Sequence, residues 1–466
     1  MKHLLQICIF LMCMSPLPAA EKPNFIIIFT DDQGYADLSC FGGTHVSTPH
    51  IDKLAAEGSR LTSFYVASPL CTPSRAALMT GCYPKRIDMG TGSNFAVLLA
   101  GDKKGLNPNE VTIAEVLKEQ GYATGMFGKW HLGDQPEFLP TRQGFDEFFG
   151  IPYSHDIHPY HPRQKNFNFP PLPLLEGEKV IEEDPNADFL TQKFTDRAVQ
   201  FIEKNKDRPF FIYLPHPIPH APLHVSPESM KTVDSKIRES LMKEKGSGKI
   251  DYTLRRKLFR QAITEIDNSV KSIVDCLKKN GIDEKTMIIF TTDNGPSIGK
   301  ATPLRGKKGQ TWEGGQRVPA FVRWPGKIPS GQLCSEVLTS MDILPTLTAL
   351  AGGKLPEKKI DGKDIFEVLQ GKAQSPHKHF FYYSHTKVHL DAVRSGKWKL
   401  RMENFKAVEL YNLESDISEK VNVIKDYPEI VEGLLKAAKE FDTDISANIR
   451  PAAYSSEAKP LSMSEK

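Results

Sequence analysis

Two segments far apart in the chain share one design, a continuous apolar run that ends in oxygen-bearing side chains. Residues 24–30 (NFIIIFT) run into Asp31 and Asp32, and residues 286–292 (TMIIFTT) run into Asp293–Asn294. Apolar runs without polar alternation are typical of central strands in a parallel sheet, because both of their faces are covered. We therefore predict an α/β fold with a mostly parallel sheet in which these two strands are buried.

Two further apolar runs end in basic side chains. They are residues 122–127, followed by Lys129 and His131, and residues 209–214, followed by His216 and His220. In open parallel α/β sheets the ligand binds beyond the carboxyl ends of the strands. We therefore expect the four strand ends to converge on one site.

The remaining segments predict helical crossovers and a second, smaller subdomain. Apolar residues recur at steps of three and four in 254–277, and residues 112–120 end at Gly121, so both are expected to form helices that pack on the sheet. From Phe380 onward, short strands are followed by a helix near 429–441, which is typical of a small antiparallel sheet with one helix. The predicted organisation is a signal peptide (1–20), a main domain (21–375), a C-terminal α+β subdomain (376–450) and a polar tail (451–466).

The first twenty residues have the pattern of a secretory signal peptide. A basic start is followed by an apolar run from Leu4 to Met14 and by Ala19–Ala20 before Glu21. No later run reaches the roughly 18 apolar residues of a membrane span, and the chain has no Asn-X-Ser/Thr glycosylation pattern. We expect an exported bacterial protein, periplasmic or secreted, without a membrane span. A lipid anchor at Cys13 stays open, although the residues before it are not small.

The charge of the chain excludes one class of partner. The sequence has 60 basic and 57 acidic residues, a net charge of +3, and its basic residues are dispersed. Nucleic acid is therefore not an expected partner.

Cysteine usage points to one unusual thiol. Of the seven cysteines, two lie in the predicted signal peptide and five in the rest of the chain. An odd number in an exported protein leaves at least one cysteine without a disulfide partner. Their spacing identifies no pair. The five are Cys40, Cys71, Cys82, Cys276 and Cys334.

The oxygen-bearing strand ends predict a metal site. Asp31, Asp32 and Asp293 would repel one another in one crevice unless a divalent cation lay among them. With Asn294 they offer several hard oxygen ligands, which favours Ca²⁺ over Mg²⁺. An isolated Asp-Asp pair can instead cap a helix, but the recurrence at a second strand end favours the metal.

Basic side chains next to such a metal predict an anion with tetrahedral oxygens, either sulfate or phosphate. The candidates are Lys129, His131, His220 and Lys308, of which the two histidines each follow a buried strand. Histidines in loops are more often structural or solvated. We interpret His155, His158, His161 and His216 in that way.

The stretch at residues 68–81 (SPLCTPSRAALMTG) places Cys71 at the start of a predicted helix. Thr72 is a candidate N-cap and Pro73 a candidate first helical residue. Cys71 would then lie at the positive end of the helix dipole and face the anion site. Zinc is disfavoured because no second cysteine or histidine lies at a suitable spacing. On these local grounds an activated thiol nucleophile and a chemically modified cysteine both stay open.

The run Cys71-Thr72-Pro73-Ser74-Arg75, with Thr80-Gly81 downstream, closely resembles the signature of type I sulfatases. Further segments resemble the same family along nearly the whole mature chain: residues 29–35, 128–133, 219–222, 293–295, 304–308, 312–315 and 410–413. Residues 150–156 (GIPYSHD) are similar to the arylsulfatase A branch, which makes Ser154 a candidate sulfate contact.

This resemblance implies an alkaline phosphatase-like fold, with residues 21–375 as the catalytic domain, and a chemical change at Cys71. In the family a formylglycine-generating enzyme oxidises this cysteine to Cα-formylglycine, an aldehyde that hydrates to a diol. One diol oxygen attacks sulfur, and the second hydroxyl later expels sulfate, which needs two oxygens on one carbon. The implied metal ligands are Asp31, Asp32, Asp293, Asn294 and the modified Cys71.

The resemblance also implies a role for each basic side chain. Arg75 would hold the diol, and Lys129 would bridge diol and sulfate. His131 would help to deprotonate the second hydroxyl, and His220 would protonate the leaving alcohol. Lys308 would bind the sulfate oxygens.

The expected activity is hydrolysis of sulfate monoesters, of a sulfated saccharide and also of aryl sulfates. Two alternatives stay open, a phosphodiesterase or phosphonate hydrolase of the same superfamily and a non-catalytic glycan-binding protein on this fold. Residues 87–104, 153–184 and 223–249 are predicted loops that would select the substrate.

Overall fold

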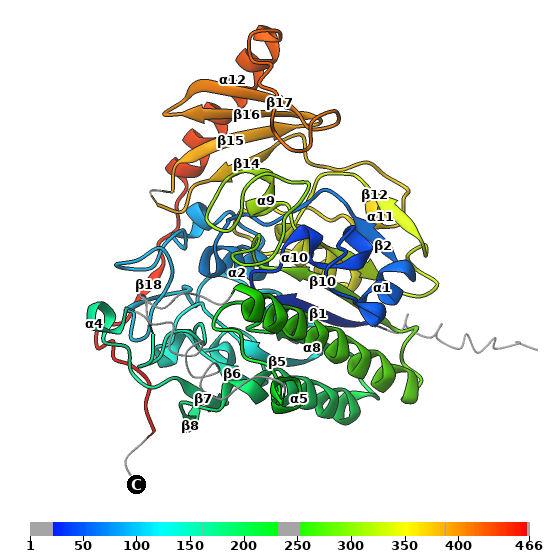
Figure 1. Ribbon diagram of the computed structural model, residues 1–466, viewed down its shortest axis with the longest axis vertical. Helices are drawn as coiled ribbons and strands as arrows, with labels where there is room; N and C mark the ends of the chain where they lie inside the picture. The colour runs from blue at the N-terminus through cyan, green and yellow to red at the C-terminus, as the bar shows by residue number, and fades with distance from the viewer. Residues whose placement is uncertain (1–21, 162, 232–251, 387, 464–466) are drawn as a thin grey trace, which may run out of the picture.

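Figure 1 shows the computed structural model of the protein, which describes residues 22–161, 163–231, 252–386 and 388–463. Within these residues, a ten-stranded mixed sheet has the order β12-β2-β11-β10-β1-β9-β5-β6-β7-β8. The strands from β10 to β6 in this order run parallel. The strands are β1 (Asn24–Thr30), β2 (Ser59–Leu61), β5 (Ala123–Lys129), β6 (Glu147–Ile151), β7 (Pro173–Glu176), β8 (Lys179–Glu183), β9 (Phe210–Pro215), β10 (Thr286–Thr292), β11 (Phe321–Arg323) and β12 (Gln332–Cys334).

Strand β1 shows why the central strands are apolar throughout. Phe25, Ile27 and Phe29 point into one hydrophobic core, and Ile26 and Ile28 point into a second core on the opposite face. Both faces of the strand are therefore removed from water, as the absence of alternation predicts.

Helices cover both faces of the sheet. One core receives side chains from α2 (Cys71–Thr80), α3 (Ile113–Glu119) and α10 (Ile343–Leu350). The other receives side chains from α1 (Pro49–Ala56), α5 (Leu190–Asn205) and α8 (Tyr252–Lys279). In Figure 1, α5 and α8 lie on the viewer's side of the sheet. The shorter helices are α4 (Gln164–Phe167), α6 (Pro227–Met230), α9 (Glu313–Gln316) and α11 (Phe366–Leu369).

The predicted central elements are confirmed. β1 and β10 occupy the predicted ranges, and β5 continues to Lys129, so this lysine is the last residue of its strand. α3 begins at a capping box in which Thr112 Oγ1 accepts a hydrogen bond from the Glu115 backbone N–H at 3.2 Å. The helix ends just before Gly121, whose positive φ of 83° fits the predicted left-handed cap.

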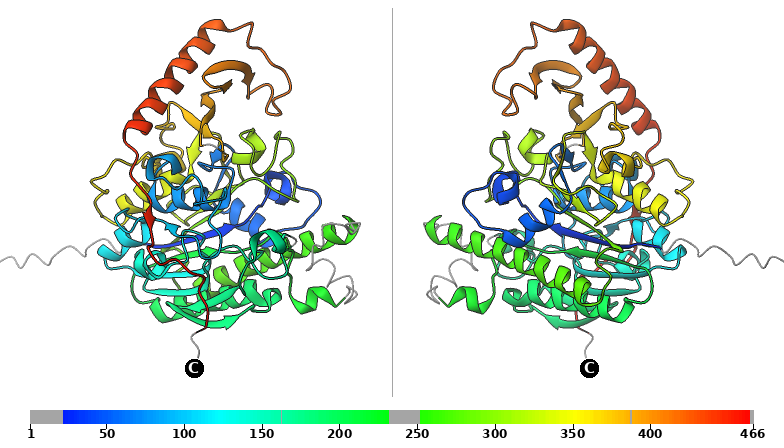
Figure 2. Two further views of the ribbon diagram at one scale, coloured as in Figure 1. Left: turned by 90° about the vertical axis from the view of Figure 1, so that its left-hand side faces the viewer. Right: turned by 90° about the vertical axis from the view of Figure 1, so that its right-hand side faces the viewer.

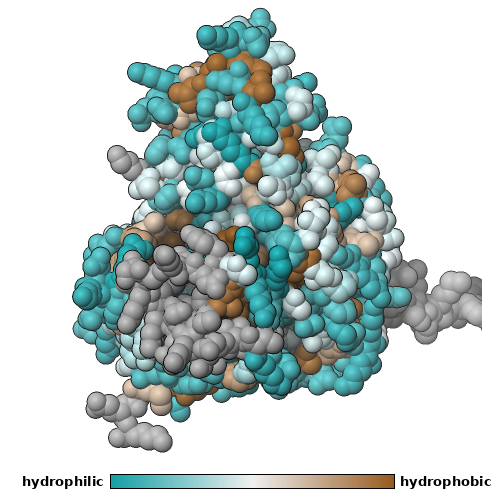
Figure 3. All heavy atoms as spheres, viewed as in Figure 1, coloured by the Kyte–Doolittle hydropathy of each residue, from teal (hydrophilic) through white to brown (hydrophobic). Residues whose placement is uncertain are grey.

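A smaller antiparallel sheet follows the main body, as predicted. Its strands are β14 (Phe380–Tyr383), β15 (Leu390–Ser395), β16 (Trp398–Glu403) and β17 (Lys406–Asn412), in that order. Helix α12 (Pro428–Ala447) covers one face of this sheet, and both project from the main body (Figure 2). Figure 3 shows apolar side chains exposed over this part of a largely hydrophilic face.

One predicted loop contains regular structure. The predicted loop at 153–184 holds α4 and the hairpin β7–β8, which pairs antiparallel with β6 and makes β8 the edge of the sheet. Its several prolines and charges conceal these short elements, because edge strands have weak hydrophobic patterns. The predicted signal peptide and residues 243–249 lie outside the described residues.

Residues of the predicted polar tail lie along the main body (Figure 2). β18 (Ala453–Tyr454) pairs antiparallel with β4 (Lys104–Gly105), and the Lys459 backbone N–H donates to Gln135 Oε1 at 3.1 Å. A further short pair is β3 (Phe64–Tyr65) with β13 (Leu338–Thr339).

All five cysteines of the described residues are free thiols. The odd number of cysteines therefore does not single out Cys71, because the other four described cysteines form no disulfides either. In the described part of the chain, no helix has the length and apolar character of a membrane span.

Candidate active site

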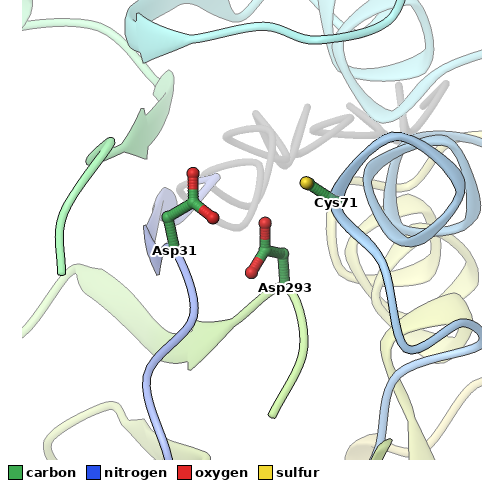
Figure 4. Close-up of side chains that lie close together, drawn as sticks. All are labelled: Asp31, Cys71 and Asp293. Atoms are coloured by element: carbon green, nitrogen blue, oxygen red, sulfur yellow. The ribbon is translucent and has the colours of Figure 1, made fainter. Parts of the chain in front are cut away.

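The site forms at the carboxyl ends of β10, β1, β9 and β5, which are adjacent in the sheet. The Asp32 backbone N–H donates to Asp293 Oδ1 at 3.1 Å, and Asn294 Nδ2 donates to Asp32 Oδ1 at 2.6 Å. Figure 4 shows the carboxylates of Asp31 and Asp293 turned toward Cys71. The predicted convergence of oxygen-bearing strand ends is therefore present in the structure.

Cationic side chains surround these carboxylates. Lys129 Nζ lies 2.5 Å from Asp31 Oδ2, and Arg75 Nη2 lies 2.9 Å from Asp293 Oδ2. Lys308 Nζ lies 2.8 Å from Asp32 Oδ1. Except for Lys308, whose side chain is partly exposed, these groups are buried, so their interactions are screened little by water.

The carboxylates respond to this environment in opposite ways. Burial alone would raise the pKa of Asp31, but the charges of Lys129, His220 and Arg75 outweigh it and hold that pKa well below its usual value. Burial, reinforced by the charge of Asp31, raises the pKa of Asp293 to about 6. Asp31 therefore stays ionised, whereas burial and the neighbouring carboxylate oppose the ionisation of Asp293.

The donor atoms fit a hard divalent cation. Buried Asp31 Oδ1 and Asn294 Oδ1 have no hydrogen-bond partner among the described residues. Ligand atoms of Asp31, Cys71 and Asp293 lie within 4.8 Å of one another, and the same holds for Asp31, Asp32 and His220. Unpaired buried oxygens are costly unless a cation binds them.

Cys71 is the first residue of α2, and the predicted N-cap at Thr72 is wrong. Leu70, with extended backbone, precedes the helix, and Thr72 Oγ1 instead accepts a hydrogen bond from the Leu98 backbone N–H at 3.2 Å. Pro73 is thus the third helical residue, where its missing N–H costs no hydrogen bond. Burial raises the pKa of the Cys71 thiol despite nearby Lys129, which disfavours an activated thiolate.

Backbone strain is concentrated in the site. Asp32 and His131 have φ values of 64° and 65°, in the left-handed region that residues other than glycine seldom adopt. Such strain persists only where surrounding structure enforces it, and it is frequent in active sites.

His131 is held as a neutral base. Its Nε2 lies 2.9 Å from the Leu98 carbonyl oxygen, and its buried Nδ1 has no partner among the described residues. Burial, together with Lys129 and Arg75, holds the pKa of His131 well below its usual value. With Nε2 as the donor, Nδ1 carries a free lone pair.

A cavity of about 310 Å³ opens above these groups and is lined by Cys71, His131, Ser154, His220 and Lys308. His220 Nε2 lies 3.7 Å from Asp32 Oδ2. All sequence-predicted site residues thus lie in one place. His216 does not belong to it, because its buried ring contacts Ser269 Oγ at 2.9 Å, in agreement with the structural role predicted for it.

Sequence reasoning missed several residues of the cavity. Asp156 follows Ser154 by two positions and is partly exposed, with its pKa held low by His220 against the effect of desolvation. His161 lines the cavity, although we interpreted it as an ordinary loop histidine. His385 reaches the cavity from the segment between β14 and β15, and no pattern in the sequence indicates that contact.

Comparison with known proteins identifies relatives along most of the chain. A family model described as sulfatase matches residues 23–353, and one described as N-sulphoglucosamine sulphohydrolase, C-terminal, matches residues 307–443. Arylsulfatase A of Homo sapiens is 39% identical over 410 residues, covering 82% of this chain and 75% of that protein. Arylsulfatase G of Mus musculus is 36% identical over 405 residues, with 78% and 72% covered.

Solved structures agree with this assignment. The crystal structure of Ps i-CgsB matches with a TM-score of 0.78 and 33% identity, covering 92% of this chain and 95% of that one. PsFucS1 sulfatase from Pseudoalteromonas sp. matches with a TM-score of 0.76 and 28% identity, covering 92% and 90%. Phosphonate monoester hydrolase of Agrobacterium radiobacter, at 0.64 and 20%, shares the fold. With its family model and its relatives in agreement, the chain belongs to the sulfatase family and is a sulfuric ester hydrolase.

Proposed function

We propose that this sulfatase removes sulfate from monoesters of a saccharide, and from aryl sulfates as surrogates, by means of Cα-formylglycine derived from Cys71. The observation that carries the proposal is the position of Cys71, whose Sγ lies with carboxylate oxygens of Asp31 and Asp293 within 4.8 Å of one another. A hydrated aldehyde there would supply the nucleophilic oxygen and the second hydroxyl that expels sulfate.

The metal is proposed to be Ca²⁺, held by Asp31, Asp32, Asp293, Asn294 and the modified Cys71. The unpaired oxygens of Asp31 and Asn294 and the number of oxygen ligands support this choice over Mg²⁺. The cation would supply Lewis-acid stabilisation of negative charge at the reacting oxygens.

The lysines and the arginine position the reacting groups. Lys129 and Lys308 each contact a carboxylate of the crevice and are proposed to turn toward sulfate oxygens once that negative charge is offset. Arg75, fully buried against Asp293, would hold the hydrated side chain at position 71. Ser154, which lines the cavity, would donate a hydrogen bond from its hydroxyl to a sulfate oxygen.

Two histidines handle protons in the proposal. His131 would accept the proton of the second hydroxyl at Nδ1, because that atom is unpaired and the ring is neutral. His220, which lines the cavity, would donate a proton to the leaving oxygen of the alcohol. The two rings thus have opposite tasks in the two halves of the reaction.

A saccharide substrate is supported by a relative. Ps i-CgsB, 33% identical, has been crystallised with k-i-k-neocarrahexaose, and that complex matches this chain with a TM-score of 0.77.

Export to the periplasm or the medium of a bacterium is proposed from the leader pattern and the absence of glycosylation patterns. Maturation would require a formylglycine-generating enzyme as a partner.

The test combines mass spectrometry with sulfate release. Trypsin cleavage after Arg60 and Arg75 yields a peptide that contains Cys71, and the expected finding in active protein is an aldehyde in place of the thiol. Purified protein should release sulfate from 4-nitrophenyl sulfate, whereas Cys71→Ala should not. An intact thiol in fully active protein would contradict the mechanism. Faster hydrolysis of aryl phosphate diesters than of aryl sulfates would favour the phosphodiesterase alternative.

A further inference from the structure

Part of the cavity wall is aromatic. Phe167 and Phe169 stack with ring centroids 4.8 Å apart, and Phe95 meets Phe167 edge to face at 5.6 Å. All three line the same cavity as Cys71. Phe95 is 38% exposed, so part of its ring remains open to a ligand. The wall combines two of the loops predicted to select the substrate.

An arginine stands on this aromatic wall. The guanidinium of Arg163 lies 5.1 Å from the ring centroid of Phe167 and 6.0 Å from that of Phe95. Arg163 also lines the cavity, is exposed, and forms no ion pair with a carboxylate of the described residues. By contrast, exposed Arg142 pairs with Glu178 at 2.7 Å. The charge of Arg163 is therefore available to a ligand.

The charge distribution of the cavity indicates where a second anionic group would bind. Near the reacting end, Lys129, Lys308 and Arg75 are committed to carboxylates, and Asp156 adds further negative charge to the lining. A second anion would be repelled there. A guanidinium binds carboxylate or sulfate oxygens in bidentate geometry, so Arg163 suits either group.

The size and lining of the cavity restrict the rest of the ligand. A volume of about 310 Å³ is at the lower end of the usual range for ligand pockets, roughly 300 to 1,000 Å³. One ring fits this space better than an extended chain. The exposed face of an aromatic side chain can pack against the apolar face of that ring.

We propose that Phe95, Phe167 and Arg163 form a subsite for a single saccharide ring that carries two anionic groups. One is the sulfate ester at the reacting end, and the other is a carboxylate or a second sulfate bound by Arg163. The orientation of this ligand rests on the proposed function, since it assumes that the ester lies beside position 71. The subsite itself rests on the aromatic wall and the unpaired guanidinium.

The test measures binding in the Cys71→Ala protein, which cannot turn over substrate. The probes are a disulfated hexosamine, a monosulfated hexuronic acid and a monosulfated neutral hexose, titrated by calorimetry. At least one two-anion sugar should bind about 10- to 100-fold more tightly than the monosulfated hexose, which carries one anionic group. Adding Arg163→Gln should remove this advantage. Tighter binding of only the disulfated or only the carboxylated sugar would identify the group that Arg163 recognises.

Two further variants complete the design. Arg142 is an exposed arginine outside the cavity lining, so Arg142→Gln should leave the preference for two-anion sugars unchanged. Phe95→Ala should weaken the binding of all three sugars. Equal binding of the two-anion sugars and the monosulfated hexose, or an equal loss for all three with Arg163→Gln, would overturn the proposed subsite. Sulfate release by the unsubstituted protein is measured separately. Its absence despite charge-dependent binding would contradict the proposed function alone.

Discussion

The residues in and around the active site differ in how far the sequence predicts their positions and roles. Asp31 and Asp293 follow apolar strands, and Cys71 lies in a distinctive motif, so their shared location was predictable. Thr72 was mispredicted because a short polar side chain near a helix start can serve the helix or a neighbouring loop. The backbone N–H of Leu98, which decides between these roles, is brought there only by tertiary structure.

The adjacent lysines 307 and 308 provide a matched pair of substitutions. Lys308 Nζ contacts Asp32 and lines the cavity, whereas Lys307 is exposed. Lys308→Ala should lower kcat/KM for 4-nitrophenyl sulfate by about 100- to 1,000-fold, because a cation aimed at the transition-state charge is lost. Steady-state kinetics of Lys307→Ala should match the unsubstituted enzyme. The reverse order of effects would refute the assignment of sulfate binding to Lys308.

Metal removal should destabilise the folded state, since the unpaired buried oxygens of Asp31 and Asn294 would lose the cation that they bind. After treatment with a chelator, Ca²⁺ at a hundred times its Kd should add about 2.7 kcal/mol to the free energy of unfolding. Thermal unfolding with and without Ca²⁺ measures this difference. Asp293→Asn should reduce the gain. An equal effect of Mg²⁺ at the same concentration would argue against a calcium-selective site.

At the scale of elements, the central strands were predictable and their order was not. β1 and β10 have long apolar runs that fit only a buried strand, and their bounds agree with the prediction. The adjacency of β10, β1, β9 and β5 depends on the packing of crossovers such as α5 and α8, which periodicity does not order. The aromatic wall was also not predictable, because it joins two loops that have no periodic pattern.

Buried His216, the residue that follows β9, should lower the stability of the fold in acid. Burial lowers the pKa of His216, which contacts Ser269 of α8, to about 3. The unfolded chain takes up a proton below about pH 6.5, whereas the folded chain does not, so stability is lost as pH falls from 6.5 toward 3. This loss is about 1.4 kcal/mol per pH unit within that window.

Urea unfolding at pH 6.5 and pH 5 tests this effect. His216→Gln can still reach the Ser269 hydroxyl but does not titrate, so its loss of stability between the two pH values should be smaller by about 2 kcal/mol. An unchanged pH dependence in His216→Gln would show that other groups control acid unfolding.

At the scale of the whole molecule, one buried glutamate joins the main body to the smaller antiparallel sheet. The carboxylate of Glu313 in α9 accepts hydrogen bonds from Tyr65 of β3 and Tyr382 of β14, and it lies 3.0 Å from Lys399 Nζ of β16. Burial opposes ionisation, but Lys399 and Arg394 outweigh it and lower the pKa of Glu313 to about 2. Its stabilising charge is therefore retained until pH falls from about 4.5 through 2.

Glu313→Gln should lower the free energy of unfolding by about 3 kcal/mol, since it removes one partner of buried Lys399. Chemical denaturation at neutral pH measures the loss. Glu409→Gln, in a partly exposed pair with Arg401 at 3.8 Å, should change stability by less than about 1 kcal/mol. Equal losses in both variants would show that Glu313 is not a specific junction.

The burial of α2 has a consequence for the timing of maturation. All ten residues of this helix are buried, and Cys71 is only 3% exposed. An enzyme that oxidises Cys71 cannot reach it once α2 is packed between the sheet and α10. Under the proposed chemistry, modification must come before folding is complete, and a chain that folds first would keep its thiol permanently. The yield of active enzyme would then be decided by a race between modification and folding of the new chain.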